Sequence, residues 1–481
     1  MFKTIIGLEV HAQLKTETKA FCSCANDPQS QPNTHICPIC TGQPGTLPRI
    51  NRKMIELAIK AAIALNGQVN DHIIFDRKNY FSADMPKGYQ ITQYQKPLAE
   101  NGWVEIFNSA RKKKITINEI HLEEDSARTL KKIDTRSGRE KSYLDFNRSG
   151  IPLIEIVTAP AISSPKEAAE FFEAIHMILV YLDICNGHLE SGTMRTDANI
   201  SLLDSQTGKH TGRVEIKNLN TFKNLERALT YEEVFLKDHF QDFSAEKALT
   251  KDWDERSRTT IPSREKETSS DYRCFEEPDL PKIQLEQAII NHCAQQILEK
   301  PFERLERLMH EYNLTFDMAK SLIIDRPFVD FFEQTMKILG TDVMKHMILR
   351  DVKAYLNHSG KLIQQTYLTP EKLYQLLKFI KTGQIAPTLK TKLLATLCET
   401  PKGIETIIEE ENLIKIDDQD SLLQILEAVI TENEEQYEAY ICGKKELLKW
   451  FIGQMIKRTK GRTDPKLIIR IIKERMGEQN E

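Results

Sequence analysis

Strict alternation between apolar and polar residues near the start of the chain restricts this segment to a β-strand with one apolar face. In IGLEVHAQL, residues 6–14, apolar side chains occupy the even positions, and Glu9, His11 and Gln13 occupy odd ones. Successive side chains of a strand point to opposite faces of its sheet. The segment therefore predicts a sheet whose second face carries ionisable groups.

Three more strand-like segments carry ionisable residues among apolar ones. In ITINEIHLEED, residues 115–125, Glu119, His121 and Glu123 share one face, whereas Glu124 shares the other face with apolar neighbours. The other two segments, TMRTDANISL and RVEIKNLN, contribute Asp197, Glu215 and Lys217.

These acids have two interpretations. A charged group on a strand in a domain core is costly unless it is paired or bound to a metal. Converging carboxylates with a histidine and lysines are what Mg²⁺ and the phosphates of a nucleotide require. Alternatively, each acid lies on a solvated face of an antiparallel sheet. The residues alone leave both interpretations open.

Four cysteines form two close pairs in FCSCANDPQSQPNTHICPIC, residues 21–40. Zinc prefers four thiolates supplied by two short turns, and CPIC has the usual spacing, although CSC is tighter. We expect a structural zinc, with buried free thiols as the alternative. Four thiolates leave no open position for catalysis, so this metal would only stabilise the fold. The predicted ligands are Cys22, Cys24, Cys37 and Cys40.

Composition places the protein among ordinary soluble proteins. Of its 481 residues, 40% are hydrophobic and 28% charged, and a chain of this length is expected to form two to four domains. It has no apolar run long enough to cross a membrane, and its first residues lack the features of a signal peptide. We therefore expect a cytoplasmic protein with reduced thiols and no disulfide framework.

Several common catalytic motifs are absent from the sequence. It contains neither GxxxxGK[ST] nor GxGxxG, which mark phosphate loops and dinucleotide folds. It also lacks HExxH and GxSxG, which mark zinc peptidases and serine hydrolases.

The C-terminal part of the chain is predicted to be helical. Residues 243–271 are polar and predict a mobile loop, and amphipathic patterns follow EEPDLP. We expect a catalytic domain over 1–290 with a zinc knuckle at 22–40, a helical domain over 291–408, and a helical tail domain over 409–481.

The tail divides by charge. Residues 409–438 hold eleven acids and one lysine, whereas residues 443–475 hold eleven bases and three acids. A basic helical segment is often a solvated face, but on a chain of net charge −4 it favours contact with a phosphate backbone. The candidates for this nucleic-acid contact are Lys444, Lys445, Lys457, Arg458, Lys460 and Arg462.

The chain resembles the B subunit of the glutamyl-tRNA(Gln)/aspartyl-tRNA(Asn) amidotransferase. The matching stretches are IGLEVHAQL, FDRKNYF, PKGYQITQY, IHLEED, DFNRSGIPLIEIV, ESGTMRTDANISL, EIKNLNTF, DYRCFEEPDLP and GQMIKRTKGRTDP. The cysteine pairs followed by GQPGTLP resemble the zinc-bearing members of the family. The chain departs from the family pattern in TTIPSREKE and at Thr196 and Arg213.

The resemblance implies an α+β protein: an N-terminal antiparallel-sheet cradle of glutamine-synthetase-like type with the zinc knuckle, followed by all-α helical and tail domains. It also implies a glutamine-hydrolysing carbon–nitrogen ligase. ATP would phosphorylate the side-chain carboxylate of Glu-tRNA(Gln) or Asp-tRNA(Asn), and ammonia from a partner amidase, the A subunit, would then amidate it. A small C subunit would complete a heterotrimer.

Roles follow for individual residues. We expect Mg²⁺ ligands or their immediate neighbours among Glu9, His11, Glu124, Asp197 and Glu215, with Glu123 as the less certain neighbour. Lys78 of FDRKNYF and Lys217 are candidates for neutralising phosphate charge. A non-catalytic, zinc-stabilised RNA-binding protein remains the alternative. The archaeal tRNA(Gln)-specific relative is set aside, because no large inserted domain fits between DYRCFEEPDLP and the tail.

Overall fold

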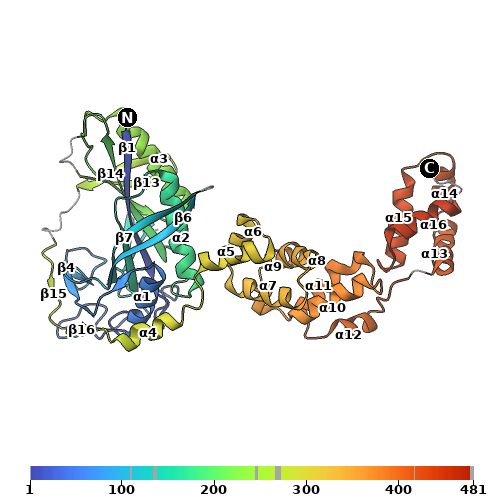
Figure 1. The fold of residues 1–481 in the computed structure, drawn as a ribbon, viewed down its shortest axis with the longest axis horizontal. Helices are drawn as coiled ribbons and strands as arrows, with labels where there is room; N and C mark the ends of the chain where they lie inside the picture. The colour runs from blue at the N-terminus through green and yellow to red at the C-terminus, as the bar shows by residue number, and fades with distance from the viewer. Residues whose placement is uncertain are drawn as a thin grey trace. The chain divides into compact units, whose positions relative to one another are not determined.

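The structure is a computed structural model that describes residues 2–108, 111–133, 138–243, 248–265, 272–416 and 418–476. The chain forms two compact units, Met1–Asn313 and Leu314–Glu481. The first is a mixed α+β unit built on a large sheet, and the second is helical (Figure 1).

A nine-stranded sheet organises the first unit, with the strand order β14-β13-β12-β11-β1-β10-β7-β6-β2. All neighbouring pairs are antiparallel except β12 and β13. The strands are β1 Phe2–Gln13, β2 Gln68–Val69, β6 Ala99–Asn108, β7 Arg111–Glu124, β10 Pro152–Thr158, β11 Met194–Asp204, β12 Val214–Leu219, β13 Leu249–Asp254 and β14 Thr259–Glu265.

Smaller sheets and helices complete the unit. The small strands are β3 His72–Ile73, β4 Asp76–Asn79, β5 Tyr89–Thr92, β8 Arg128–Ile133, β9 Glu140–Asp145, β15 Phe275–Glu276 and β16 Ile283–Gln284. The helices are α1 Arg52–Ala64, α2 Pro165–Tyr181, α3 Phe222–Asp238, α4 Gln287–Gln295 and α5 Pro301–Tyr312. Helices α2 and α3 pack together against the large sheet, where Leu8 and Val10 of β1 are fully buried.

Helix α2 begins at a polar cap. The Ser164 side chain accepts a hydrogen bond from the backbone N–H of Glu167, and Pro165 occupies the first turn. The Glu167 carboxylate in turn accepts from the backbone N–H of Ser163 at 2.9 Å. Lys113 of β7 donates to the same carboxylate at 2.6 Å, which ties the start of the helix to the sheet.

The prediction of a mobile loop over residues 243–271 is wrong for its described part, because β13 and β14 pair there as a hairpin. Two of its polar side chains are buried and tie the hairpin to α3: Lys251 and Thr260 bind the two oxygens of the Glu232 carboxylate at 2.7 and 2.6 Å. Pro262 lies on β14, the edge strand of the sheet, which is the kind of strand that tolerates proline. Residues 244–247 and 266–271 of this prediction lie outside the described residues.

The second unit consists of helices. They are α6 Phe316–Ile323, α7 Arg326–Ile338, α8 Asp342–His346, η1 Met347–Val352, α9 Lys353–Ser359, η2 Ile363–Gln365, α10 Pro370–Lys381, η3 Pro387–Leu389, α11 Lys390–Glu399, α12 Ile404–Glu410, α13 Gln419–Glu432, α14 Glu434–Ile441, α15 Leu447–Arg458 and α16 Pro465–Arg475.

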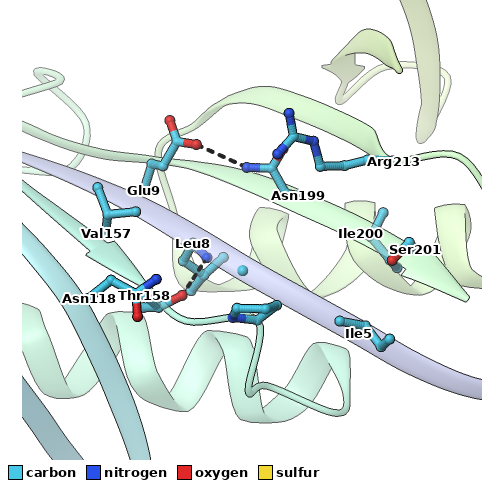
Figure 2. Close-up of a pocket in the computed structure, with 12 residues that line it drawn as sticks. Ile5, Leu8, Glu9, Asn118, Val157, Thr158, Asn199, Ile200, Ser201 and Arg213 are labelled. Atoms are coloured by element: carbon cyan, nitrogen blue, oxygen red, sulfur yellow. Dashed lines mark hydrogen bonds between the residues drawn. The ribbon is translucent and has the colours of Figure 1, made fainter. Parts of the chain in front are cut away.

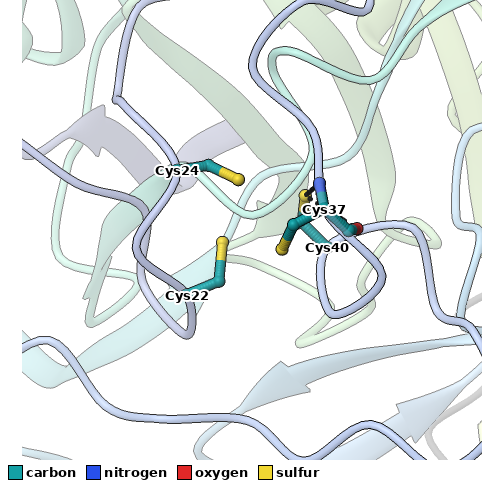
Figure 3. Close-up of side chains that lie close together, drawn as sticks. All are labelled: Cys22, Cys24, Cys37 and Cys40. Atoms are coloured by element: carbon teal, nitrogen blue, oxygen red, sulfur yellow. Dashed lines mark hydrogen bonds between the residues drawn. The ribbon is translucent and has the colours of Figure 1, made fainter.

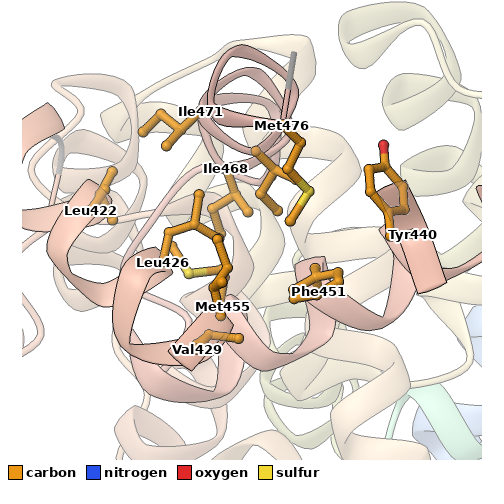
Figure 4. Close-up of a cluster of buried hydrophobic side chains, with 11 residues drawn as sticks. Leu422, Leu426, Val429, Tyr440, Phe451, Met455, Ile468, Ile471 and Met476 are labelled. Carbon is orange, nitrogen blue, oxygen red and sulfur yellow. The ribbon is translucent and has the colours of Figure 1, made fainter. Parts of the chain in front are cut away.

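The last four helices share one hydrophobic core (Figure 4). Leu426 of α13, Tyr440 of α14, Phe451 of α15 and Ile468 of α16 are all buried in it. Because α15 and α16 supply a large part of these contacts, the basic tail cannot be removed without exposing the apolar faces of α13 and α14.

The compact units differ from the predicted domain limits. The first unit runs past residue 290 to Asn313, since α4 packs on α1 and Arg304 of α5 donates a hydrogen bond to the Tyr181 hydroxyl at 2.9 Å. The predicted division between 408 and 409 stays a prediction.

Across the parts of the chain that are described, no helix is both long and apolar enough to cross a membrane.

Candidate functional site

The polar face of the large sheet carries a row of ionisable side chains at its centre. His11 of β1 lies opposite Glu155 of β10 on one side and Arg195 of β11 on the other. Glu155 in turn lies opposite His121 of β7. Alternation places these residues on one face, and the strand order places them next to each other.

A cavity of about 450 Å³ opens over this row. Its walls combine acids, cations and the segment that joins β4 to β5. The lining residues are Glu9, His11, Lys78, Tyr80, Phe81, Ser82, Asp84, Gln90, Glu123, Asp125, Ser126, Glu155, Arg195, Asp197, Lys217 and Tyr272.

Three of these side chains could hold a metal ion. One ligand atom each from His11, Glu123 and Glu155 lies within 4.8 Å of the other two. His11 Nε2 is 3.4 Å from Glu155 and 3.9 Å from Glu123. Two carboxylates and an imidazole suit a divalent cation that favours oxygen ligands.

The electrostatics of the cavity show an excess of negative charge. Burial raises the pKa of Glu9, and the charge of Glu155 raises it further. Burial and the charge of Glu155 also raise the pKa of Glu123. Burial lowers the pKa of His11, but the hydrogen bond and the charge of Glu155 outweigh burial and leave that pKa raised. A bound cation would relieve this repulsion.

Three cations surround the acids. Lys217 Nζ is 3.9 Å from Asp197 and 3.6 Å from Glu215, and Arg195 is 3.4 Å from Asp125. The charges of Glu123 and Glu155 raise the pKa of Lys78 against the opposing effect of burial, so this lysine keeps its charge. The cavity can therefore accept both a metal ion and an anion such as a phosphate.

Most of the predicted site residues meet at this cavity. Those that line it are Glu9, His11, Lys78, Glu123, Asp197 and Lys217. Glu215 is buried beside the lining and accepts a hydrogen bond from Thr250 at 3.1 Å.

The structure does not bring Glu124 to the cavity. Its carboxylate lies on the opposite face of β7 from Glu123, as the alternation in the sequence indicates. It forms a buried ion pair with Lys87 and accepts the backbone N–H of Ile91 at 3.0 Å.

Sequence reasoning missed Glu155, Arg195 and Asp125. Glu155 is the one polar residue between Pro152 and Val157, so the same alternation that singled out Glu9 could have found it. The Asp125 carboxylate forms ion pairs with two guanidinium groups, that of Arg148 at 2.6 Å and that of Arg195 at 3.4 Å. Their charges hold its pKa below the usual range although burial alone would raise it.

A second cavity of about 280 Å³ adjoins the first and shares Glu9 with it (Figure 2). Its walls mix apolar side chains such as Ile5 and Val157 with amides and a guanidinium. Asn199 donates a hydrogen bond to Glu9 at 3.0 Å, while its own carbonyl oxygen is buried without a partner among the described residues. Arg213 also lines this cavity.

The four cysteines converge in the loop between β1 and α1 (Figure 3). Their sulfur atoms all lie within 4.8 Å of one another, which fits a tetrahedral zinc whose sulfur ligands lie about 3.8 Å apart. The hydrogen bond from Cys22 lowers the pKa of Cys40 to about 4, and burial opposes this effect. The buried ammonium of Lys19 lies 3.6 Å from the Cys40 sulfur, where it offsets thiolate charge. The residues present therefore fit the metal.

Comparison with known families gives two matches in chain order. Residues 4–291 match the family described as the GatB/GatE catalytic domain, and residues 330–476 match the one described as the GatB domain. The B subunit of the aspartyl/glutamyl-tRNA(Asn/Gln) amidotransferase of Thermotoga maritima is 40% identical over 474 residues, 98% of each chain. The chain belongs to the GatB family.

Other GatB relatives agree along nearly the whole length. The protein of the same name from Thermosipho melanesiensis is 40% identical over 479 residues, which cover 99% of this chain and 100% of the relative. That from Clostridium tetani is 37% identical over 478 residues, 98% of each chain. The GatB/GatE match spans both cavities and the cysteine loop, and the resemblance drawn from the sequence motifs is confirmed.

The six basic residues predicted to contact RNA differ in how many contacts they make within the protein. Arg458 pairs with Glu432, and Arg462 donates to the backbone oxygen of Asn412 at 3.1 Å. Lys445 lies 5.1 Å from the centre of the Tyr440 ring. The remaining three, Lys444, Lys457 and Lys460, are exposed.

Proposed function

We propose that this chain uses ATP to activate the side-chain carboxylate of Glu-tRNA(Gln), Asp-tRNA(Asn) or both, within a tRNA-dependent amidotransferase complex. The observation that carries the proposal is the metal-competent group His11, Glu123 and Glu155 with three cations around it. The names of the GatB relatives support the choice of substrate.

The side-chain carboxylate must be activated before it reacts with ammonia, because hydroxide is a poor leaving group. A carboxylate oxygen of the substrate attacks the terminal phosphorus of ATP, ADP leaves, and an acyl phosphate forms. Ammonia then attacks the acyl carbon, and inorganic phosphate leaves with the C–O electron pair. Lys78, Arg195 and Lys217 hold and neutralise the phosphates through these steps.

Mg²⁺ bound by His11, Glu123 and Glu155 would add charge neutralisation to the transferred phosphoryl group. Glu9, Asp197 and Glu215 remain candidates for further ligands, since the first two line the same cavity and Glu215 lies beside it. Glu124 is left out of this set because its carboxylate is already paired with Lys87. The four cysteines would hold a structural zinc apart from the reaction.

The second cavity is proposed to take the nucleoside of ATP. It shares Glu9 with the acid cavity, so a nucleoside there would lead its phosphates towards the cations. Apolar walls with amide and hydroxyl groups suit a purine and a ribose. Ser201→Leu should raise the KM for ATP several-fold. A raised KM for tRNA instead would assign this cavity to the acceptor end of the substrate.

The ammonia and the remaining subunits of the complex would be supplied by other proteins. The sequence offers no Ser-Ser-Lys amidase signature, so we propose that a separate amidase, the A subunit, supplies the ammonia and that a small C subunit completes a cytoplasmic heterotrimer. The sheet unit would act as a cradle like that of glutamine synthetase. The basic tail would contact tRNA through phosphates. The isolated chain should not hydrolyse glutamine.

The test compares the assembled complex with Glu-tRNA(Gln) and Asp-tRNA(Asn) side by side. ATP-dependent formation of Gln-tRNA or Asn-tRNA is expected, and the faster substrate identifies the physiological one. An absence of Mg·ATP binding, together with retained tRNA binding, would favour the non-catalytic RNA-binding protein instead.

A further inference from the structure

The four-cysteine loop touches the wall of the acid cavity at one point. Gly42, two residues after Cys40, adopts a φ of +67°, and a Cβ there would lie 2.8 Å from the Cα of Lys87. The backbone of Gly42 is fixed by the cysteine turn, because its N–H donates to the Ile39 carbonyl at 3.1 Å. No side chain larger than hydrogen fits this contact without a shift of the Lys87 backbone.

Lys87 belongs to the segment that lines the cavity. Tyr80, Phe81, Ser82 and Asp84, which precede Lys87 in the segment between β4 and β5, all face the cavity. A backbone hydrogen bond from Ala127 to the Asp84 carbonyl also holds this segment to the end of β7, at 2.9 Å.

The Lys87 side chain makes the second attachment. Its ammonium pairs with Glu124, and both side chains are at least nine-tenths buried. Glu124 also accepts the N–H of Ile91 in β5, and Gln90 donates to the Glu124 carbonyl at 2.8 Å and to Glu123 at 3.1 Å. Glu124 is therefore bound to the end of this segment that leads into β5.

Gly150 packs between the cysteine loop and Glu124. A Cβ on Gly150 would lie 3.6 Å from Cys40, 3.7 Å from the Glu124 carboxylate and 3.7 Å from the Lys19 side chain. The metal ligand, the ion pair and the cavity wall thus form one packed group.

We propose that the four-cysteine loop positions residues 80–91 along the acid cavity, through the contact of Gly42 with Lys87 and the ion pair of Lys87 with Glu124. Glu124 is thereby a positioning residue, and metal in the cysteine cluster stabilises the wall of the catalytic cavity. The consequence for catalysis rests on the proposed function, whereas the mechanical coupling does not.

Gly45 provides a matched control for the first experiment. It lies in the same loop with a φ of +83°, but a Cβ there would meet nothing within 4 Å. Gly42→Ala and Gly45→Ala carry the same kind of backbone penalty, so only the contact with Lys87 distinguishes them. Hydrogen exchange of the full-length chain is measured for residues 80–91, together with its zinc content.

We expect Gly42→Ala to speed exchange in residues 80–91 by about tenfold or more while about one zinc per chain is kept. Gly45→Ala should exchange like the unmodified chain. Equal exchange in the two variants would overturn the proposal.

A second pair of variants decides the case if Gly42→Ala does not fold. Lys87→Met leaves a buried carboxylate unpaired and should speed exchange in residues 80–91. In the assembled complex, Lys87→Met should also raise the KM for ATP. Adding Glu124→Gln removes the unpaired charge, so the double variant should regain slow exchange in residues 80–91 and the KM for ATP of the unmodified complex. A double variant that exchanges as fast as the single one would overturn the coupling. Slow exchange with activity still abolished would show that Glu124 acts on the reaction and is not a positioning residue.

Metal removal supplies the last test. Chelation of zinc from the unmodified chain should speed exchange in residues 80–91, with α13 of the second unit as the internal reference. Unchanged exchange in residues 80–91 after zinc loss, or a purified chain without zinc, would overturn the proposal. Absence of ATP-dependent amidation in the unmodified complex would instead contradict the proposed function and leave the exchange results standing.

Discussion

His11 and Glu155 lie directly opposite each other in the β1–β10 ladder, with His11 Nε2 3.4 Å from the Glu155 carboxylate. The two residues are far apart in the sequence, and neither could form a metal group from its own strand. Their pairing lets Glu155 raise the pKa of His11 and lets His11 lower that of Glu155, although burial opposes both effects.

This pair provides the first prediction. Glu155→Gln keeps the shape of the side chain but removes one of two carboxylates from the proposed metal group, so ATP-dependent amidation should fall by about a hundredfold or more. The affinity for tRNA should hardly change. Glu119→Gln is the control, since Glu119 lies on β7 nearby but is half-exposed and pairs with His121 outside the cavity lining. Comparable losses in both variants would remove Glu155 from the metal group.

The second prediction concerns zinc. Cys37→Ser with Cys40→Ser removes two of four thiolates, so the zinc content should fall from about one per chain to none. Elemental analysis measures the content, and stability to denaturant should fall with it. The control is Cys442→Ser, whose thiol is exposed and separate from the cluster. Full zinc retention in the double variant would contradict the assignment.

The third prediction concerns the basic tail. Because α15 and α16 share the core of α13 and α14, deletion of residues 443–481 would unfold this bundle, and charge substitution is the cleaner test. Lys457→Gln with Lys460→Gln should weaken tRNA binding. It should also reduce the steepness with which the logarithm of the association constant falls against the logarithm of salt concentration by about 1.5. A matched pair, Lys361→Gln with Lys381→Gln, removes the same charge from exposed positions elsewhere in the second unit. An equal salt slope for both pairs would show that the tail is only a solvated face.

The fourth prediction concerns pH and the start of α2. The hydrogen bond from Lys113 holds the pKa of Glu167 below its usual range, although burial acts in the opposite direction. A carboxyl whose pKa is lowered on folding stabilises the protein above its unfolded pKa of about 4.3 and loses this effect as the pH falls through the lower, folded value.

Glu167→Gln should therefore lower the free energy of unfolding by about 1 kcal/mol at about pH 7, and the difference should be smaller at about pH 3. Denaturant titrations at the two pH values measure it. Glu226→Gln on the exposed side of α3 is the control and should show no such difference. A loss for Glu167→Gln that is the same at both pH values would rule out the charge as its cause.

The face of each strand that carries the polar groups follows from the order of residues along the strand. Alternation placed Glu9 with His11 on one face of β1 and placed Glu123 and Glu124 on opposite faces of β7, where the structure has them, although the choice of Glu124 as a metal ligand was wrong. The sequence also identified the four-cysteine loop and the cap of α2 at Ser164, because such signals depend on residues close in the chain.

Which strands are neighbours becomes known only from the folded protein. Alternation fixes a face but not a partner, because strand pairing between distant segments depends on the packing of the whole sheet. The position of β1 between β10 and β11 brings Glu155 and Arg195 to His11, and a distant turn supplies Lys87 to Glu124. The polar hairpin of β13 and β14 was missed for the same reason: its side chains are stabilised by Glu232 of α3, a partner that the local sequence does not reveal.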